Sequence, residues 1–365
     1  MKILYIITQG DGGGAQKYVL SLAKHFNGAI AAGEETEELF SQAGAFGLQT
    51  FRLKHLKRAV NLWHDILAVW EIRGLIKTFR PDILHLNSSK AGFLGSLAGM
   101  GLSAKVIFTA HGFIFNEPQP VWKKNFYLAL ETVASDFRDF IITVSEADKK
   151  SALAHNLIEP KKIQTVHNGL LPQDFLPRLE AQKKLGFDGS KTVIGTIANF
   201  YKTKGLDVLV RAVSQLDKNT LDKCQFVIIG DGPENSRLKT LILELSLTHN
   251  FLLTGEVANA SSCLKAFDVF ILPSRKEGFP FAILEAMQAG LPIIASDAGG
   301  IKEALGEAGI LVETENPGQL AEALKNLLLD NGKKNTLSKK ALERAGEFSR
   351  QKMLDETEKI YRQLL

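Results

Sequence analysis

The sequence of 365 residues has few cysteines and no long apolar run. Its two cysteines, Cys224 and Cys263, lack metal-ligand spacing, which excludes a disulfide framework and indicates a reducing compartment. The longest weakly polar run, residues 91–104, contains four glycines and is shorter than the roughly 18 residues of a membrane span. The apolar residues 1–8 are too few for a signal peptide. We therefore expect a cytoplasmic protein that would meet a membrane only from its surface.

A strong excess of charge of one sign is also missing. The net charge is +4, which is too small to indicate nucleic-acid binding, and we expect no nucleic-acid partner. Charged residues make up 23% and hydrophobic residues 45%, a balance typical of globular proteins. The chain is long for one hydrophobic core, so its length favours two domains.

Short apolar runs alternate with helical patterns along the chain. The pattern predicts strands in the first half at residues 3–8, 83–86, 106–109, 141–144 and 163–167, and in the second half at residues 192–198, 225–229, 251–253, 269–272 and 292–295. Helices are expected between the strands, one of them at residues 258–266. This alternation predicts doubly wound parallel sheets. Residues 169–189, which contain two prolines, are interpreted as the crossing between domains.

Two glutamates, Glu277 and Glu285, are separated by seven residues directly after the strand predicted at 269–272. Pro280 is typical of a first helical turn and Gly290 of a helix end, so Glu277 is expected on the entering loop and Glu285 inside the helix. A helix N-terminus suits a phosphate, and a carboxylate suits the hydroxyls of a sugar. This spacing also arises by chance in helical proteins, but together the two chemistries favour a nucleotide-sugar site.

The stretch 274–290 closely resembles the E-x7-E signature of the retaining glycosyltransferases of family 4, which have the GT-B fold, and further matches extend from Gly13 to Gly300. The resemblance implies an α/β protein with two Rossmann-like, doubly wound parallel-sheet domains that face a cleft. Residues 1–172 would form the acceptor-binding domain and residues 173–348 the nucleotide-sugar domain. Residues 349–365 would form a helix that crosses back to the first domain.

The resemblance also implies a reaction. A sugar would move from a nucleotide-sugar, with UDP-hexose or UDP-N-acetylhexosamine as the first hypothesis, to a glycan or polyprenyl-linked acceptor. The Glu-Gly-Phe-Pro version of the signature resembles bacterial enzymes that build surface polysaccharide or lipopolysaccharide. No Asp-x-Asp pair occurs in the sequence, and other glycosyltransferases use that pair to hold a divalent metal. We therefore expect no essential metal.

Individual roles follow from the same resemblance. Glu285 would bind the ribose hydroxyls, and Lys204 would stabilise the leaving diphosphate. Glu277 would hold the sugar near its C3 and C4 hydroxyls, and His111 would contact the C6 hydroxyl. The catalytic candidates are therefore His111, Lys204 and Glu277. The donor-binding candidates are Gly13, Gly14, Asn199, Lys202, Lys204, Val257, Glu277, Gly278, Phe279 and Glu285.

Some of these positions have plainer explanations. Many relatives carry an arginine where this chain has Asn199, and an asparagine cannot neutralise a phosphate, so Lys202 is the candidate for the second positive charge. Lys204 alone would be an ordinary surface lysine, and a strand-end histidine such as His111 is often structural. The missing arginine keeps open a GT-B protein that binds a nucleotide-sugar without catalysis.

Two further segments leave alternatives open. Residues 10–15 fit the G-x-G-x-x-A dinucleotide fingerprint, with Glu34 near the position of a ribose-binding acid, so an NAD-dependent oxidoreductase is the alternative function. Residues 50–80 contain seven lysines and arginines against two acids, together with Trp63 and Trp70. This segment would either rest on an anionic membrane or pack its tryptophans on the sheet as an ordinary amphipathic helix.

Overall fold

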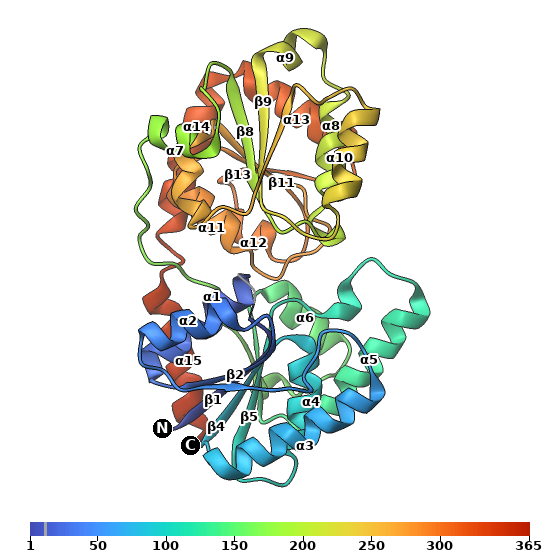
Figure 1. The fold of residues 1–365 in the computed structure, drawn as a ribbon, viewed down its shortest axis with the longest axis vertical. Coiled ribbons are helices and arrows are strands. Elements are labelled where there is room, and N and C mark those ends of the chain that lie inside the picture. The colour runs from blue at the N-terminus through green and yellow to red at the C-terminus, as the bar shows by residue number, and fades with distance from the viewer. Residues whose placement is uncertain (11–12) are drawn as a thin grey trace. The chain divides into compact units, whose positions relative to one another are not determined.

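The computed structural model describes residues 1–10 and 13–365 and divides into two compact units. Unit 1 contains Met1–Asn168 and Gln351–Leu365, and unit 2 contains Gly169–Arg350. The sequence places these limits at 172 and 348 instead. Each unit is a parallel sheet with helices on both faces, so each is a doubly wound α/β domain, as the alternating pattern predicts (Figure 1).

Unit 1 is built on a seven-stranded parallel sheet in the order β3-β2-β1-β4-β5-β6-β7. Its strands are β1 (Ile3–Gln9), β2 (Ala29–Glu34), β3 (Thr50–Arg52), β4 (Ile83–Asn87), β5 (Lys105–Ala110), β6 (Phe140–Thr143) and β7 (Ile163–Thr165). Its helices are α1 (Gly14–Phe26), α2 (Glu37–Ala45), α3 (Leu62–Phe79), α4 (Ser89–Gly99), η1 (Ile114–Asn116), α5 (Val121–Ser135), α6 (Glu146–Ala154) and η2 (Pro160–Lys162).

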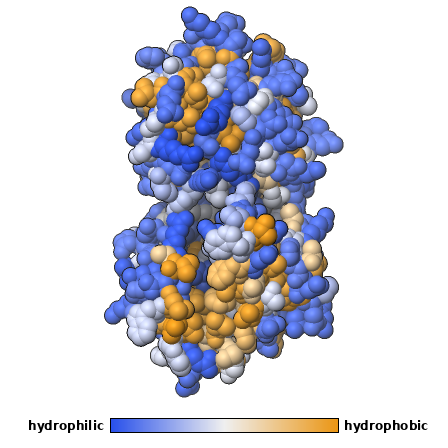
Figure 2. All heavy atoms as spheres, turned by 90° about the vertical axis from the view of Figure 1, so that its right-hand side faces the viewer, coloured by the Kyte–Doolittle hydropathy of each residue, from blue (hydrophilic) through white to orange (hydrophobic). Residues whose placement is uncertain are grey.

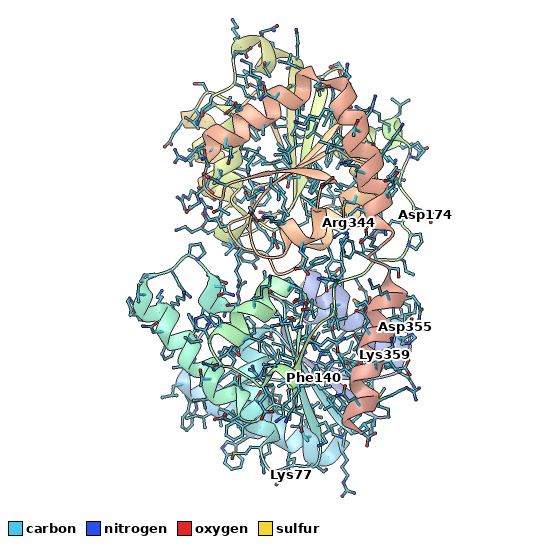
Figure 3. All side chains as sticks on the ribbon, turned by 180° about the vertical axis from the view of Figure 1, so that it is seen from behind. Lys77, Phe140, Asp174, Arg344, Asp355 and Lys359 are labelled. Carbon is cyan, nitrogen blue, oxygen red and sulfur yellow. The ribbon has the colours of Figure 1, made fainter. Side chains whose placement is uncertain are left out.

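The last helix, α15 (Arg350–Leu364), completes unit 1 although it follows the whole of unit 2 in sequence. The buried Tyr361 hydroxyl hydrogen-bonds the Nδ1 atom of His85 on β4 and donates to the Tyr5 hydroxyl of β1 at 3.3 Å. Figure 3 marks this helix with the labels Asp355 and Lys359. The C-terminal segment therefore supplies part of the core of unit 1.

Unit 2 contains a six-stranded parallel sheet in the order β10-β9-β8-β11-β12-β13. Its strands are β8 (Thr192–Ile197), β9 (Cys224–Ile229), β10 (Phe251–Gly255), β11 (Val269–Leu272), β12 (Ile293–Ser296) and β13 (Gly309–Val312). Its helices are α7 (Arg178–Leu185), η3 (Lys202–Lys204), α8 (Leu206–Val213), α9 (Lys218–Lys223), α10 (Asn235–Glu244), η4 (Ala260–Ala266), α11 (Phe281–Gln288), α12 (Ile301–Leu305), α13 (Pro317–Leu329) and α14 (Asn331–Ala345).

The strand order reverses at one point in each sheet, between β1 and β4 in unit 1 and between β8 and β11 in unit 2. At such a point the loops after neighbouring strands lead to opposite faces of the sheet and leave a crevice between them. Ligands of open α/β sheets bind there, beyond the carboxyl ends of the strands. The loops after β8 and β11 carry Lys204 and Glu277, so the fold brings these two candidates to such a point.

Three strands lie outside the sequence prediction, namely β2, β3 and β13. The sequence of β2, AIAAGE, is rich in alanine, which has weak strand propensity, but it is held between β1 and β3 in the sheet. The helix predicted at residues 258–266 is a 3-10 segment, η4. The crossing predicted at residues 169–189 contains helix α7, which Pro177 precedes as its N-cap. In these places the tertiary environment overrides the local signal.

The basic segment 50–80 contains β3 and the whole of α3, and its tryptophans do not pack on the sheet. Trp63 and Trp70 are 69% and 68% exposed, whereas the buried residues of α3 are Ala68, Ile72 and Ile76. The alternative in which the tryptophans form the buried face of an amphipathic helix is therefore wrong. Small and aliphatic residues fill that face instead.

Candidate active site

Lys204 and Glu277 form an ion pair at the switch point of the unit 2 sheet. The Lys204 ammonium donates to Oε1 of Glu277 at 2.7 Å, and the Ser274 hydroxyl donates to the same oxygen at 2.7 Å. The Glu277 side chain is 8% exposed and that of Lys204 is 28% exposed. Within the described residues, Glu277 Oε2 and two of the three ammonium protons of Lys204 have no protein partner. The pair therefore presents both an acceptor and donors to a ligand.

Two glycines allow the backbone to bring these groups together. Gly205, directly after Lys204, has a φ of +63°, and a Cβ atom there would lie 2.0 Å from the carbonyl oxygen of Pro273. Gly299 has a φ of +56°, and a Cβ atom there would lie 1.8 Å from the carbonyl oxygen of Glu277. Only glycine fits both the left-handed conformation and the close approach. The turn carrying Lys204 and the loop at Gly299 thus press against the loop carrying Glu277.

Arg275 joins the same two segments through its side chain. It donates to both carboxylate oxygens of Asp207 on α8, at 2.7 and 2.9 Å, and to the carbonyl oxygen of Lys202 at 2.7 Å. Its Nε atom donates to Glu315 at 2.8 Å. Sequence reasoning missed Arg275 and Asp207, because they lie 68 positions apart and neither carries a motif of its own.

The rest of the signature lies in the loop before α11 and inside that helix. Glu285 is buried in the helix, and Phe279 is buried with its ring centroid 5.1 Å from that of Phe348. The carbonyl oxygen of Gly278 accepts the Gly300 N–H at 2.9 Å. Phe279 and Gly278 thus have structural contacts that fix the loop. Glu285 is a buried carboxylate one turn into the helix, as the sequence places it.

The other unit 2 candidates also follow strand ends. Asn199 follows β8, is half-buried, and accepts the Tyr201 N–H through its carbonyl oxygen at 2.8 Å. Lys202 lies in η3, two residues before Lys204, and its side chain is exposed. Val257 is half-buried after β10. None of these three has a described hydrogen bond to Lys204 or Glu277.

His111 directly follows β5 in unit 1, and its ring packs edge-on against Tyr18 at 4.9 Å between centroids. Its Nε2 atom is buried without a hydrogen-bond partner among the described residues. Burial lowers the pKa of His111 to about 4, so the ring is neutral near pH 7. A buried, unpartnered ring nitrogen requires an explanation, and a ligand hydroxyl is one.

A second histidine in unit 1, His85, was absent from the predicted site. Its Nε2 atom lies 2.6 Å from the Thr109 hydroxyl, and its Nδ1 atom bonds Tyr361. Burial, with a smaller contribution from His111, lowers the pKa of His85 to about 3. Both of its ring nitrogens are satisfied, so His85 has the contacts of a structural residue.

The glycine loop of unit 1 is described only in part. Gly13 is the N-cap of α1 and Gly14 its first residue, while the predicted positions Asp11 and Gly12 lie outside the described residues. Glu34, the acid of the dinucleotide alternative, ends β2 and accepts the Arg58 N–H at 2.7 Å. That carboxylate already has a protein partner.

No group of three or more His, Cys, Asp or Glu side chains in the described part of the chain is arranged to hold a metal ion. No described helix is both long and apolar enough to span a membrane.

Comparison with known proteins identifies the family. The family model for "Glycosyltransferase Family 4" matches residues 12–173, and that for "Glycosyl transferases group 1" matches residues 177–344. The Escherichia coli UDP-Gal:alpha-D-GlcNAc-diphosphoundecaprenol alpha-1,3-galactosyltransferase is 31% identical over 260 residues, which cover 69% of this chain and 67% of that protein. The chain belongs to glycosyltransferase family 4. The family matches favour transfer of a sugar over the NAD-dependent alternative.

Other matches agree with this family. The Escherichia coli O-antigen biosynthesis glycosyltransferase WbnH is 27% identical over 319 residues, which cover 85% of both chains. The crystal structure of Anabaena Alr3699/HepE in complex with UDP superposes with a TM-score of 0.83 at 20% identity, covering 100% of both chains. The predicted GT-B fold of this family 4 glycosyltransferase is thus confirmed.

Proposed function

We propose that this glycosyltransferase moves a hexosyl or N-acetylhexosaminyl group from UDP, with retention of configuration, to a glycan or polyprenyl-linked acceptor. The product would enter bacterial surface polysaccharide or lipopolysaccharide. The observation that carries the proposal is the Lys204–Glu277 pair at the switch point of unit 2. The names of the galactosyltransferase and O-antigen relatives support the UDP donor and the pathway.

Each donor-site residue receives a proposed role. Glu285, buried in α11, would bind the ribose hydroxyls, and Val257 would lie at the nucleobase. Lys204 would donate hydrogen bonds from its two remaining ammonium N–H groups to the diphosphate. Lys202 would supply the second positive charge, in place of the arginine that many relatives carry at the position of Asn199. The backbone at Gly278 and Phe279 would contact the donor, and that at Gly13 and Gly14 the diphosphate or the acceptor.

The sugar itself would be held by two side chains. Glu277 Oε1 is occupied by Lys204 and Ser274, which leaves Oε2 to accept hydrogen bonds from the C3 and C4 hydroxyls. The unpartnered Nε2 atom of His111 would meet the C6 hydroxyl. A neutral His111 suits this contact, because it either donates or accepts one hydrogen bond without adding charge.

The proposed transfer needs no protein nucleophile. The acceptor oxygen bonds to C1 of the sugar on the face from which the diphosphate leaves, while the C1–O bond to the phosphate breaks. The acceptor proton passes to the leaving phosphate oxygen. Lys204 stabilises the negative charge that develops there, and the Glu277 carboxylate stabilises the positive charge that develops on the sugar. We propose that this occurs without an essential divalent metal.

Calorimetric titration of the purified protein with UDP, GDP, ADP and NAD, in the presence of a chelator, tests the donor class. We expect preferential binding of UDP that is lost in Glu285→Ala, followed by transfer in a screen of UDP-sugars with retention at C1. Tight binding of GDP or ADP would indicate that the donor is a GDP-sugar or an ADP-sugar and not a UDP-sugar. Binding of NAD alone would contradict the proposed function. A requirement for added Mg²⁺ would contradict metal independence.

We further propose that unit 1 contacts an anionic membrane, at the inner face of the cytoplasmic membrane. The outward stripe of α3 carries Trp63, Ile66 and Trp70, and that of α5 carries Trp122, 67% exposed, and Phe126. Figure 2 shows that hydrophobic residues gather on the face of unit 1 where α3, α4 and α5 lie. Exposed aromatic residues of this kind suit a membrane interface.

The charges on this face suit anionic lipid. Lys123 and Lys124 are exposed beside Trp122, whereas the acid of α5, Glu131, is buried and paired with Arg138 at 2.7 Å. On α3, Asp65 is paired with Lys90 at 2.6 Å. The exposed charge of the two helices is thus mainly positive. Lysines near such a surface each add about 1 kcal/mol of attraction.

Sedimentation with phosphatidylglycerol vesicles tests the membrane contact. All three tryptophans of the chain lie on α3 and α5, so binding should shift their fluorescence to shorter wavelength. We expect the double variant Trp70→Ser/Trp122→Ser to bind the vesicles more weakly. The control variant Leu329→Ser, which changes an exposed apolar residue of α13 in unit 2, should bind them as the wild type does. Equal binding by both variants, or equal binding to phosphatidylcholine, would contradict the contact.

A further inference from the structure

Arg275 makes more side-chain hydrogen bonds than any catalytic candidate, and they reach three separate segments. Its guanidinium donates two parallel hydrogen bonds to the Asp207 carboxylate. It also donates to the Lys202 carbonyl oxygen and to the Glu315 carboxylate. Its own backbone N–H donates to the Thr203 carbonyl oxygen at 2.8 Å. Arg275 therefore contacts the first two residues of η3, the turn that ends at Lys204, and also helix α8, which follows that turn.

The same residue belongs to the loop that carries Glu277, two positions further along. Lys204 bonds Glu277 at 2.7 Å, so the two partners of the active-site pair stand on segments that Arg275 ties together. The two ion pairs are about equally exposed, with side chains 28% and 8% exposed in Lys204–Glu277 and 9% and 27% exposed in Arg275–Asp207. They differ in bonding: Lys204 makes one hydrogen bond to Glu277, whereas Arg275 binds Asp207 with two charge-assisted bonds and also reaches two other acceptors, which makes it the stronger restraint.

The electrostatics of Asp207 agree with a tight pair. Partial burial raises the pKa of Asp207, but the hydrogen bonds and the positive charge of Arg275, with smaller contributions from other groups, together lower it by more, so the pKa lies below its ordinary value. Lysine would not replace arginine here, because an ammonium cannot make two parallel bonds to a carboxylate while also reaching two other acceptors.

We infer that Arg275 is a positioning residue for sugar transfer: with Asp207 it forms a clamp that holds the Lys204 turn and the Glu277 loop at their working separation. The inference rests on the proposed function of Lys204 and Glu277. Arg275 does not substitute for the arginine missing at Asn199, since its guanidinium is committed to Asp207, Glu315 and a backbone carbonyl. It acts on the donor only through the two residues that it places.

Kinetics of Arg275→Lys, Asp207→Asn and the double variant test the clamp. We expect kcat to fall roughly 10- to 100-fold in each single variant, because small misplacements of catalytic groups have effects of that size. The KM for the donor should change much less than kcat. The double variant should lose no more than either single variant, because both changes open one clamp.

A matched control is available in the same unit. Arg178 pairs with Asp268 at 2.9 Å, just before the start of β11 and hence at the opposite end of the strands from Lys204. Arg178→Lys should leave kcat unchanged. A loss of kcat in Arg178→Lys equal to that in Arg275→Lys would assign the effect to general destabilisation and overturn the clamp.

A second readout needs no donor. Amine labelling of Lys204, followed by mass spectrometry, should be faster in Arg275→Lys and Asp207→Asn than in the wild type, because the pair with Glu277 loosens. Unchanged labelling together with unchanged kcat would overturn the inference. Weaker UDP binding in Arg275→Lys but not in Asp207→Asn would make Arg275 a direct phosphate ligand and also overturn it. If the wild type binds no UDP, the proposal of a UDP-sugar donor is wrong. The labelling rate of Lys204 still tests whether Arg275 positions the Lys204 turn.

Discussion

At the scale of single residues, the environment of each candidate decides what it can do. Glu277 is nearly buried and has one carboxylate oxygen occupied by two donors, whereas Lys204 keeps donors to spare. His85 is buried and has partners on both ring nitrogens, whereas His111 is half-buried and its buried Nε2 atom has no described partner. The same residue type thus has structural contacts on β4, whereas after β5 it carries the proposed contact with the sugar.

Removing the charge of Glu277 or of Lys204 should slow transfer strongly without unfolding the protein. Glu277→Gln and Lys204→Ala should each lower kcat by roughly 10²- to 10³-fold, a size typical of losing one charge-stabilising group. Steady-state kinetics with far-UV circular dichroism as the folding check measure this. Glu322→Gln, at an exposed position of α13, is the control. Rates near wild type in either active-site variant would contradict the assigned roles.

The buried histidines predict acid sensitivity of unit 1. The pKa values of His85 and His111 are lowered from 6.5 to about 3 and about 4. Between these values and pH 6.5, the two histidines bind protons in the unfolded chain but stay neutral in the folded protein. The free energy of unfolding should therefore be constant above about pH 6.5 and fall below it, by on the order of a few kcal/mol. Hydrogen exchange of β1 and β4, measured at each pH, reports the stability of unit 1.

His85→Gln should reduce this pH dependence between pH 6.5 and 4, since glutamine does not titrate, and leave the part that His111 causes. The exposed His25 provides the control, and His25→Gln should leave the slope as in the wild type. An unchanged slope in His85→Gln would mean that other groups cause the acid sensitivity.

At the scale of elements, the active site is an arrangement of loops that follow parallel strands. The strands β8 and β11 are neighbours, so the loops after them meet, although they are more than 70 residues apart in sequence. Gly205 and Gly299 remove the side chains that would keep these loops apart. The close approach of backbones thus acts together with the Arg275 contacts to set the distance between Lys204 and Glu277.

A Cβ atom at Gly205 should separate the loops. Gly186 has a similar φ of +84° but nothing within 4 Å of a Cβ atom, so Gly186→Ala should cost about 1–2 kcal/mol from backbone strain alone. Gly205→Ala meets the Pro273 carbonyl oxygen as well, and should cost clearly more or lower kcat. Urea unfolding and kinetics of both variants measure this difference. Equal stability and equal activity of the two variants would contradict the close approach.

At the scale of the whole molecule, each of the two compact units has its own hydrophobic core. Unit 1 is built from two separate segments of the chain, one at each end. Helix α15 returns after residue 350 and places Tyr361 among His85, Tyr5 and Phe26. The stability of unit 1 therefore depends on the last residues of the chain, whereas the core of unit 2 is continuous in sequence.

Truncating Tyr361 should destabilise one unit selectively. Tyr361→Ala should lower the free energy of unfolding of unit 1 by about 3–5 kcal/mol, the usual cost of deleting a buried aromatic ring. Hydrogen exchange should quicken in β1 and β4 and stay unchanged in β8 and β9. Tyr361→Phe, which loses only the hydroxyl contacts, should cost about 1 kcal/mol. Equal acceleration in both units would mean that their stabilities are coupled.

The sequence by itself determined the α/β class, the family and the candidates Lys204, Glu277 and Glu285, because strand periodicity and the glutamate signature are local patterns. It did not determine β2, β3 and β13, whose short or alanine-rich segments become strands only beside their neighbours in the sheets. The tertiary structure alone decided that Arg275 meets Asp207, that His85 is satisfied by Thr109 and Tyr361, and that the tryptophans face outward. Such contacts join residues far apart in the chain, and no local pattern encodes their distance.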